Sequence, residues 1–350
     1  MQKTTKIETI DLFCGVGGLT YGLQKSGIKV IAGIDNDDTC RYAFEKNNKS
    51  KFICADLTQY GSNNIKKLYS NNSIKVLVGC APCQPFSSHS FKNKDKENDT
   101  RWSLLLHFGK LIEDMQPEII SMENVRGIVK TDIFKKFVDI LKRNNYQVDY
   151  NVVYAPDYGA PQNRSRLILL ASRLGEIKIP SPTHKKENYV KVKDIIKNLQ
   201  SVRVGQKSKN DPLHKAKKLS DTNLKRIKQS KPNGTWHDWD KKLLPDCYKK
   251  DSGQTYTSVY GRMGWDNVSP TITTQFFNYG SGRFGHPTQN RAITLREGAL
   301  LQTFPKEYDF GEIKSMTVIA RHIGNAVPPI LGEIIGNTIK QHIKNIYAKK

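Results

Sequence analysis

Short apolar runs alternate with amphipathic stretches between Lys6 and Ser172. The runs have the length of buried strands, and the stretches between them repeat apolar residues at helical spacing. Strands are predicted at Ile7–Phe13, Lys29–Ile34, Lys51–Cys54, Lys75–Val78, Glu118–Met122, Gln147–Tyr154 and Leu167–Ala171. Helices are predicted at Gly18–Ser26, Asp38–Asn47, Asn64–Ser70, Trp102–Met115 and Ile133–Asn144. This alternation predicts a doubly wound α/β fold, in which ligands bind at the carboxyl ends of the strands.

The periodic pattern weakens after Arg173. Between Lys178 and Lys250 there are 20 Lys and Arg against 7 Asp and Glu, together with many Pro, Asn and Ser. This composition predicts a separate, smaller, loop-rich and basic module. Helical spacing returns at Thr294–Phe304 and Pro328–Tyr347, and the last helix is suited to pack back on the first domain. We therefore predict domains at residues 1–173, 174–290 and 291–350.

The 350-residue chain carries 56 Lys and Arg against 33 Asp and Glu, a formal net charge of +23. Such a charge favours a polyanionic partner through counterion release, although alone it also fits a role in solubility. No apolar run of about 18 residues is long enough to span a membrane. The polar start at Met1–Thr9 lacks the apolar core of a signal peptide. Six cysteines do not resemble a disulfide framework, so we expect a cytoplasmic protein with reduced thiols.

A glycine-rich turn, Asp11-Leu-Phe-Cys-Gly-Val-Gly-Gly18, follows the first predicted strand and opens the first predicted helix. Such a turn lets a ligand approach the backbone closely. Asp35 closes the second strand about 20 residues later, where an acidic side chain accepts hydrogen bonds from ribose hydroxyls. Asp56 ends the third strand. Together these positions favour a nucleoside cofactor, although either aspartate alone is also typical of a helix cap.

A cysteine follows the fourth predicted strand, in Val78-Gly-Cys-Ala-Pro-Cys-Gln-Pro-Phe-Ser-Ser88. Residues 84–100 have no apolar periodicity, and a structureless loop of this length in a compact domain is usually a lid or a binding loop. The loop also carries three lysines, which suit a phosphate backbone. Cys83 is therefore predicted to be accessible, as a reactive thiol must be.

The order of the motifs resembles that of the cytosine-5 DNA methyltransferases. The family's Pro-Cys-Gln-x-Phe-Ser element is present at Pro82–Ser87. The other similar elements are Phe13–Gly18, Glu123-Asn-Val125, Gln162-Asn-Arg-Ser-Arg166, Arg296–Pro305 and Gly324–Pro329. They frame nearly the whole chain and leave only Leu174–Asn267 without family pattern.

The resemblance implies a fold and a division of labour. The fold would be a doubly wound mixed sheet of the Rossmann-like, S-adenosylmethionine-dependent methyltransferase type. Residues 1–173 would form the catalytic and cofactor-binding domain, residues 174–290 a target-recognition domain that binds DNA, and residues 291–350 helices that return to the catalytic domain.

The resemblance also implies a DNA (cytosine-5-)-methyltransferase of the bacterial restriction-modification type. Carbon 5 of cytosine is a poor nucleophile, and addition of a thiolate at carbon 6 makes the ring able to take a methyl group from a sulfonium. Cys83 would supply the thiolate. Glu123, partly protonated, would act on ring nitrogen 3, and Arg166, supported by Arg164, would bind the ring carbonyl oxygen. A base inside a duplex cannot reach a thiolate, so the target cytosine must be flipped out.

The cofactor that the resemblance implies is S-adenosyl-L-methionine. Phe13 would stack on adenine, Asp35 would hold the ribose, and Asp56 with Leu57 would meet adenine. The whole implied pocket consists of Phe13, Gly15, Val16, Gly18, Asp35, Asn36, Asp56, Leu57, Pro82, Leu104, Asn325 and Ala326. Three positions depart from the family pattern: Asp35 is more often Glu, Asn36 is often apolar or aromatic, and Cys80-Ala81 is commonly Gly-Pro or Pro-Pro.

Two other activities compete with this interpretation. Cys80-Ala-Pro-Cys83 is a thiol-redox signature when it opens a helix, but the residues that follow are not a helix start. An RNA cytosine-5 methyltransferase on the same fold agrees with the basic charge and disagrees with the large variable region. No second closely spaced Cys or His pair is present, so no metal site is expected.

The expected partners are double-stranded DNA and a cognate restriction endonuclease acting on the same site. We expect a monomer, without membrane attachment, that associates with the nucleoid.

Overall fold

The structure is a computed structural model that describes residues 6–82 and 100–348. The chain divides into two compact units. The first unit contains Met1–Tyr154, Ser165–Thr183 and Ala326–Lys350, and the second contains Ala155–Arg164 and His184–Asn325. Each unit therefore combines segments that are far apart in the chain. The functional division at residues 1–173, 174–290 and 291–350 stays a prediction.

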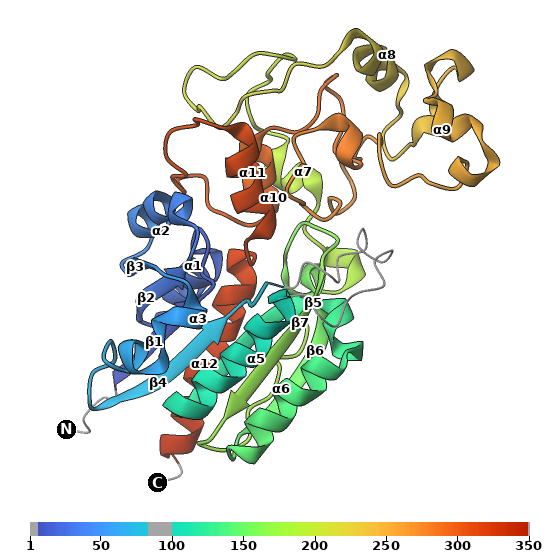
Figure 1. Cartoon of the computed structure of the whole chain (residues 1–350). Coiled ribbons are helices and arrows are strands. Elements are labelled where there is room, and N and C mark those ends of the chain that lie inside the picture. The colour runs from blue at the N-terminus through green and yellow to red at the C-terminus, as the bar shows by residue number, and fades with distance from the viewer. Residues whose placement is uncertain (1–5, 83–99, 349–350) are drawn as a thin grey trace. The chain divides into compact units, whose positions relative to one another are not determined.

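A seven-stranded sheet lies at the centre of the first unit, in the order β3-β2-β1-β4-β5-β7-β6 (Figure 1). The strands are β1 (Lys6–Leu12), β2 (Val30–Asp35), β3 (Lys51–Cys54), β4 (Ser73–Gly79), β5 (Ile119–Val125), β6 (Gln147–Tyr154) and β7 (Ser165–Ser172). β1 to β5 pair in parallel, whereas β7 is antiparallel to both β5 and β6. The prediction of a doubly wound mixed sheet is confirmed, and all seven predicted strands are present.

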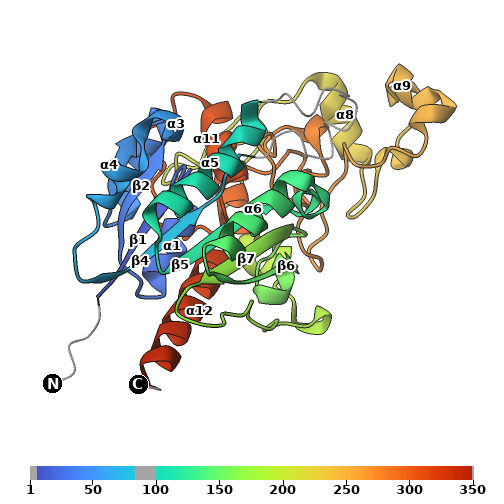
Figure 2. The same cartoon turned by 60° about the horizontal axis from the view of Figure 1, so that its bottom comes forward.

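Helices cover both faces of this sheet, with α5 and α6 on one face and α1 and α12 on the other (Figures 1 and 2). The helices of the first unit are α1 (Gly18–Lys25), α2 (Arg41–Asn47), α3 (Leu57–Tyr60), α4 (Ser62–Lys66), α5 (Thr100–Met115), α6 (Asp132–Arg143) and α12 (Pro329–Ala348). The predicted helix at Asn64–Ser70 is wrong in its bounds. Asp56 caps α3 by accepting from the Thr58 N–H, and Gly61, at φ 70°, separates α3 from α4. A positive φ of this kind suits glycine, and it interrupts the helical backbone between the two helices.

α1 and α12 approach each other closely through glycines on their facing sides. A Cβ atom on Gly22 would lie 2.0 Å from the Pro329 carbonyl oxygen, and one on Gly332 would lie 2.7 Å from the Leu19 carbonyl oxygen. His342 of α12 also hydrogen-bonds the Ser172 hydroxyl of β7 at 2.8 Å. The helix that comes last in the chain therefore packs directly on the helix that follows β1.

The second unit has short helices joined by long irregular segments (Figure 2). Its helices are α7 (Val192–Ile196), α8 (Asp221–Gln229), α9 (Asp246–Lys249), α10 (Leu295–Leu301) and α11 (Met316–Asn325). One of its hydrophobic clusters is rich in aromatic residues and consists of Ile227, Trp236, Trp239, Tyr248, Tyr279 and Ala292. Trp236 and Tyr248 stack with ring centroids 4.6 Å apart. These aromatic side chains fill a core.

Across residues 6–82 and 100–348, the helices are too short or too polar for any of them to cross a bilayer.

Candidate functional site

The turn after β1 adopts backbone angles that most side chains avoid. Phe13, Gly15 and Gly17 have φ values of 58°, 50° and 85°. A Cβ atom on Gly17 would also lie 2.5 Å from Asn48 Nδ2, so this position requires glycine for both space and conformation. Val16 and Gly18 are buried, whereas Phe13 and Gly15 are half-buried. The turn therefore carries the half-buried Phe13 at the carboxyl end of β1, and its role in cofactor binding stays a prediction.

Asp35 holds this turn from the end of β2. Its Oδ2 accepts from the Gly15 N–H at 2.9 Å, and its Oδ1 accepts from the Asp37 N–H at 2.9 Å. Burial raises the pKa of the Asp35 carboxyl. Each carboxylate oxygen has more than one acceptor site, so these bonds leave capacity for a ribose hydroxyl. Asn36 follows with an exposed side chain.

Asp56 and Leu57 follow β3, which neighbours β2, and Asp35 pairs with Cys54 across the two strands. Asp56 Oδ1 accepts from the Thr58 hydroxyl at 2.7 Å and from the Thr58 N–H at 2.9 Å. These two bonds lower the pKa of Asp56 below its usual value. Leu57 is buried. The sheet register thus brings the predicted turn, ribose and adenine residues to one edge of the first unit.

The other predicted pocket residues are distributed over both units. Leu104 lies on α5 and is half-buried, and Pro82 is exposed beyond the end of β4. Asn325 ends α11 in the second unit, whereas Ala326 opens the last segment of the first.

Cys83, the predicted nucleophile, lies outside the described residues. The backbone that leads to it is fixed by Asn124, whose Nδ2 donates to the Ala81 carbonyl oxygen at 3.1 Å. Asn124 is buried on β5, in a strand that pairs with β4. A buried amide bonded to backbone in this way sets the direction in which the chain leaves the sheet.

Glu123 and Arg166 meet at the carboxyl end of β5. The antiparallel pairing of β5 with β7 places Arg166 opposite Val125, and its Nε lies 3.1 Å from Glu123 Oε1. The side chains are 9% and 17% exposed, so this ion pair is mostly enclosed yet reachable at one edge. The Arg166 guanidinium also donates to the Ser165 carbonyl oxygen at 2.8 Å. The structure brings these two predicted catalytic residues together.

Cys80, at the end of β4, lies among acidic groups. Burial raises the pKa of its thiol well above the usual value, and the nearby charges of Glu123 and Asp11 raise it further. Redox cysteines need the opposite environment, because the thiolate is the reactive form. These surroundings disfavour the thiol-redox interpretation of Cys80.

Asp11 is a buried acid on β1 that was not among the predicted site residues. Its Oδ2 accepts from the Thr20 hydroxyl of α1 at 2.7 Å. Burial raises the pKa of Asp11 to about 7, and the neighbouring charge of Asp35 adds to that effect. Asp11 stands in the glycine-turn motif and Asn124 in the Glu-Asn-Val motif, so the sequence carried a signal for both.

Arg164 belongs to the second unit and is buried there. Its guanidinium donates to the carbonyl oxygen of Ile272 at 3.2 Å and to that of Gly324 at 3.5 Å. It thereby joins the start of this unit to the end of α11. A supporting role for Arg164 in binding a base stays a prediction.

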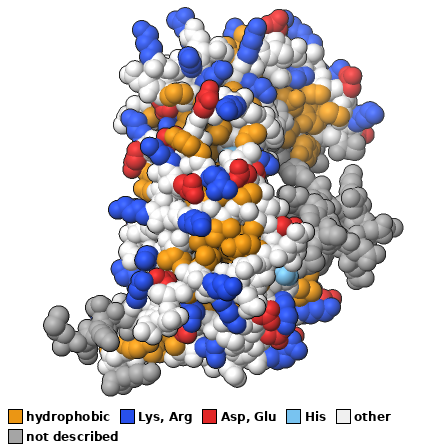
Figure 3. Space-filling model, turned by 60° about the vertical axis from the view of Figure 1, so that its left-hand side comes forward, with side chains coloured by type: hydrophobic (Ala, Val, Ile, Leu, Met, Phe, Trp, Pro, Cys, Tyr) orange, Lys and Arg blue, Asp and Glu red, His pale blue; other side chains and the backbone are white. Residues whose placement is uncertain are grey.

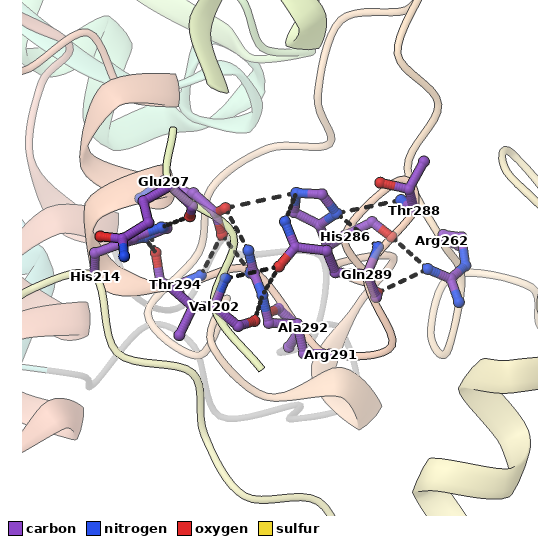
Figure 4. Close-up of polar contacts among 11 residues, drawn as sticks. Val202, His214, Arg262, His286, Thr288, Gln289, Arg291, Ala292, Thr294 and Glu297 are labelled. Atoms are coloured by element: carbon purple, nitrogen blue, oxygen red, sulfur yellow. Dashed lines mark hydrogen bonds and ion pairs between the residues drawn. The ribbon is translucent and has the colours of Figure 1, made fainter. Parts of the chain in front are cut away.

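A buried charge network organises the second unit (Figure 4). Arg291 makes two bonds to the Glu297 carboxylate, at 2.7 and 2.8 Å. Burial alone would raise the pKa of Glu297, but the Arg291 pair lowers it to about 2. Arg262 is buried as well and donates to carbonyl oxygens of His286 and Gln289 at 2.7 and 2.8 Å. These cations bind segments that have little regular structure of their own.

Lys and Arg side chains are spread over the face of the molecule shown in Figure 3, with acidic side chains among them. In the basic stretch Lys178–Lys250 the lysines are mostly exposed. This distribution suits contacts with an extended polyanion.

The parallel sheet with one antiparallel strand near its edge, the glycine turn after β1 and the acids after β2 and β3 define the class of Rossmann-like methyltransferases. Residues 7–341 match the sequence model of the family described as C-5 cytosine-specific DNA methylase. The chain belongs to this family.

Two relatives agree with the membership. The chain is 50% identical over 347 residues to the Type II methylase M.HgiDII of Herpetosiphon aurantiacus, across 97% of each protein. It is 30% identical over 356 residues to the Type II methyltransferase M1.BsuMI of Bacillus subtilis strain 168, across 95% of this chain and 80% of that protein. The predicted activity, cytosine-5 methylation of DNA of the restriction-modification type, is confirmed at the level of the family.

Two solved structures have the same fold. A putative DNA modification methyltransferase encoded within a prophage of E. coli matches with a TM-score of 0.69 and 24% identity, over 97% of this chain and 100% of that one. The Dnmt2 methyltransferase of S. pombe matches with a TM-score of 0.65 and 17% identity, over 96% of this chain and 99% of that one.

Proposed function

We propose that the chain flips a target cytosine out of duplex DNA, that Cys83 adds to carbon 6, and that the methyl group of S-adenosyl-L-methionine is transferred to carbon 5. The observation that carries the proposal is the Glu123–Arg166 pair, held at the carboxyl edge of the sheet beside the backbone that leads to Cys83. A carboxyl group and a guanidinium side by side offer one partner for ring nitrogen 3 and another for the negative charge that develops at the ring carbonyl oxygen.

The bond changes in this reaction balance. The Cys83 thiolate forms a bond to carbon 6 and pushes electron density to carbon 5, while Glu123 donates to ring nitrogen 3. Carbon 5 would then take the methyl group as its bond to the sulfonium sulfur breaks, which leaves S-adenosylhomocysteine. A water molecule would take the proton from carbon 5, the bond from the Cys83 sulfur to carbon 6 breaks, and the proton on ring nitrogen 3 returns to Glu123. Arg166 binds the ring carbonyl oxygen, and Arg164 supports this arrangement from the Gln162–Arg166 motif.

The residues after β1, β2 and β3 fit S-adenosyl-L-methionine. The cofactor supplies an electrophilic methyl group on a sulfonium. Phe13 would offer a ring face for adenine, and Asp35 keeps acceptor capacity for ribose. Both Thr58 bonds to Asp56 are made to Oδ1, so Oδ2 keeps acceptor capacity for adenine. Gly15, Val16, Gly18, Asn36, Leu57, Pro82, Leu104, Asn325 and Ala326 would complete the pocket. The acidic surroundings at this edge favour a positively charged ligand.

Duplex DNA is the proposed substrate, and residues 174–290 are proposed to read it. Because Trp236, Trp239 and Tyr248 are committed to a core, we expect exposed polar and basic side chains of this region to face the DNA. Lysines that meet phosphates position the protein, and base-edge contacts give it specificity. We further propose a monomer in the cytoplasm, associated with the nucleoid, and a cognate restriction endonuclease for the same site.

Cys83→Ala is expected to abolish methyl transfer while leaving cofactor binding largely intact, because the thiolate is required for addition but does not hold the cofactor. Duplex DNA with 5-fluorocytosine at the target should form a stable adduct with the wild-type protein, since fluorine cannot leave in the final elimination. Mapping of the adduct to Cys83 by peptide mass spectrometry is the measurement.

Bisulfite sequencing of a plasmid from cells that express the protein identifies the modified cytosine. Transfer RNA serves as the control substrate in an assay of tritium transfer. Wild-type turnover by Cys83→Ala, or transfer to RNA rather than DNA, would contradict the proposal.

A further inference from the structure

His107 of α5 makes a contact that no sequence motif predicts. Its Nε2 lies 2.7 Å from the carbonyl oxygen of Leu57, across 50 positions of the chain. A carbonyl oxygen only accepts, so Nε2 must carry the proton and donate. The bond is partly buried, which protects it from competition by water.

The bonded carbonyl belongs to the peptide unit between Leu57 and Thr58, and the N–H of the same unit donates to Asp56 Oδ1 at 2.9 Å. His107 therefore holds one end of this peptide plane, and the Asp56 carboxylate is bonded to the other. Hydrogen bonds in series polarise one another, so donation by His107 strengthens the Thr58 N–H as a donor to Asp56. The Thr58 hydroxyl donates to the same Oδ1 at 2.7 Å.

This chain of bonds fixes the orientation of an exposed carboxylate. Asp56 has a short, exposed side chain, and both Thr58 donors bond its Oδ1, so its Oδ2 keeps acceptor capacity for a ligand. His107 is also among the causes that lower the pKa of Asp56, after the larger effect of the Thr58 bonds. An ionised acceptor makes a stronger hydrogen bond than a neutral one.

We propose that His107 is a positioning residue for adenine recognition, which acts through the Leu57–Thr58 peptide to aim Asp56 Oδ2 at the 6-amino group of the cofactor. The inference rests on the proposed cofactor site. His107 is on the same face of α5 as Leu104, one helical turn later, so one helix would supply both a wall of the pocket and the support of its polar contact.

The test compares binding of S-adenosylhomocysteine with that of S-inosylhomocysteine, in which an oxo group replaces the 6-amino group. Wild-type protein should prefer the adenosyl compound by about ten- to hundredfold, because a carboxylate accepts from an amino group and repels an oxo group. His107→Ala should lose most of that preference, raise KM for S-adenosylmethionine about tenfold and leave kcat within about twofold.

Conservative variants separate positioning from general packing. His107→Gln should restore the preference, because its amide nitrogen lies at about the same distance along the side chain as Nε2, whereas His107→Asn is too short to reach. Lys110→Ala, on the exposed side of the same helix, should behave as wild type. Asp56→Asn combined with His107→Ala should lose little more preference than either single variant, since both act on one contact.

The outcomes distinguish the two proposals. If Asp56→Asn keeps the wild-type preference, adenine does not meet Asp56, and both the pocket assignment and the role of His107 are overturned. If Asp56→Asn loses the preference while a folded His107→Ala keeps it, the pocket stands and His107 has no positioning role. Thermal melting of each variant shows whether it is folded, and the Gln variant keeps the test decisive if the Ala variant is not.

Discussion

Carboxyl groups gather at the edge of the sheet where the turn after β1 begins. Asp11, Asp35 and Glu123 stand on three different strands, and each contributes to the electrostatic environment of a neighbouring group. Burial raises the pKa of both Asp11 and Asp35. Like charges brought together in a poorly solvated place disfavour further negative charge and favour a cation. The protein therefore keeps several carboxyl groups close together at the edge where a positively charged sulfonium is proposed to bind.

Asp11 should make the stability of the protein depend on pH. Its folded-state pKa of about 7 lies above the ordinary value of 3.8, so the folded protein keeps a proton that the unfolded chain has released. The stabilising contribution is present below pH 3.8 and is lost as the pH rises through 7. The loss is at most about 4 kcal/mol.

Asp11→Asn keeps an acceptor for Thr20 but cannot ionise. We expect the free energy of unfolding of the wild type to fall, relative to that of Asp11→Asn, between about pH 4 and pH 8. Urea denaturation of both proteins across this range is the measurement. Parallel pH profiles would show that Asp11 does not titrate in this window.

Residue identity at the site was predictable where a motif carried it. Glu123 and Arg166 were assigned from their motifs, and the pairing of β5 with β7 brings them together. His107 was not predictable, because its partner is a backbone oxygen, and a backbone oxygen leaves no trace in the sequence. Contacts of a side chain with remote backbone are therefore the part of a site that sequence patterns miss.

At the scale of elements, the predicted strands and helices of the sheet were found where a continuous apolar face runs through them. α8 was missed because only two of its nine residues, Leu224 and Ile227, are apolar, and the others are polar or charged. α11 was missed because it is rich in β-branched residues and ends with Gly324 and Asn325, which have low helix propensity. Tertiary packing, rather than local preference, maintains both helices.

The contact between α1 and α12 should be intolerant of side chains. Gly332→Val would place its Cβ atom 2.7 Å from the Leu19 carbonyl oxygen, and backbone cannot move aside as a flexible side chain can. We expect a loss of about 1–3 kcal/mol or more in the free energy of unfolding, measured by urea denaturation. Asn337→Ala, at an exposed position of the same helix, is the control. Equal stability of the two variants would mean that the helices can separate without cost.

The Arg291–Glu297 pair should be indispensable to the start of α10. Glu297 also accepts from the Thr294 N–H at 2.7 Å, so it caps the helix while it binds Arg291. Arg291→Met leaves this carboxylate buried without its cation, which costs about 3–5 kcal/mol.

The readout for Arg291→Met is chemical denaturation together with limited proteolysis of the second unit. Adding Glu297→Gln should recover part of the loss, because the uncompensated charge is then removed. A double variant that is less stable by the sum of both single losses would contradict the pairing.

Over the whole molecule, the excess of basic groups sets how DNA binding responds to salt. Lys217 is a poor position for testing this, because its ammonium bonds Asn278 and lies 5.0 Å from the centre of the Phe277 ring. Lys225, exposed on α8, carries a charge that is easier to remove without other effects. Lys225→Gln should weaken binding equally on all sequences and reduce the slope of log affinity against log salt by about one.

Fluorescence titration with the target duplex and with an unrelated duplex, each at several salt concentrations, measures both quantities. Lys46→Gln, exposed on α2 of the first unit, is the matched control. A larger effect on the target duplex than on the unrelated one would assign Lys225 to base reading instead.

The organisation of the whole chain was predictable in outline, since motifs near both ends belong to one family. The compact units, however, interleave along the sequence: Ala155–Arg164 lies in the second, and the residues on either side of it lie in the first. Composition changes slowly along a chain and cannot mark a segment of this length. Such crossings are set by which backbone each side chain binds, as with Arg164 and Ile272.

The close fit of α12 against α1 also has a consequence for protein synthesis. The ribosome makes α1 near the beginning of the chain and α12 near the end, and at about 5–20 residues per second the interval between them is about 15–60 s. Throughout that time α12 is not available to cover the glycine-lined face of α1. Synthesis of the first unit therefore begins before that of the second unit and ends after it. A nascent chain that stalls before α12 would expose this face of α1 to chaperones and proteases.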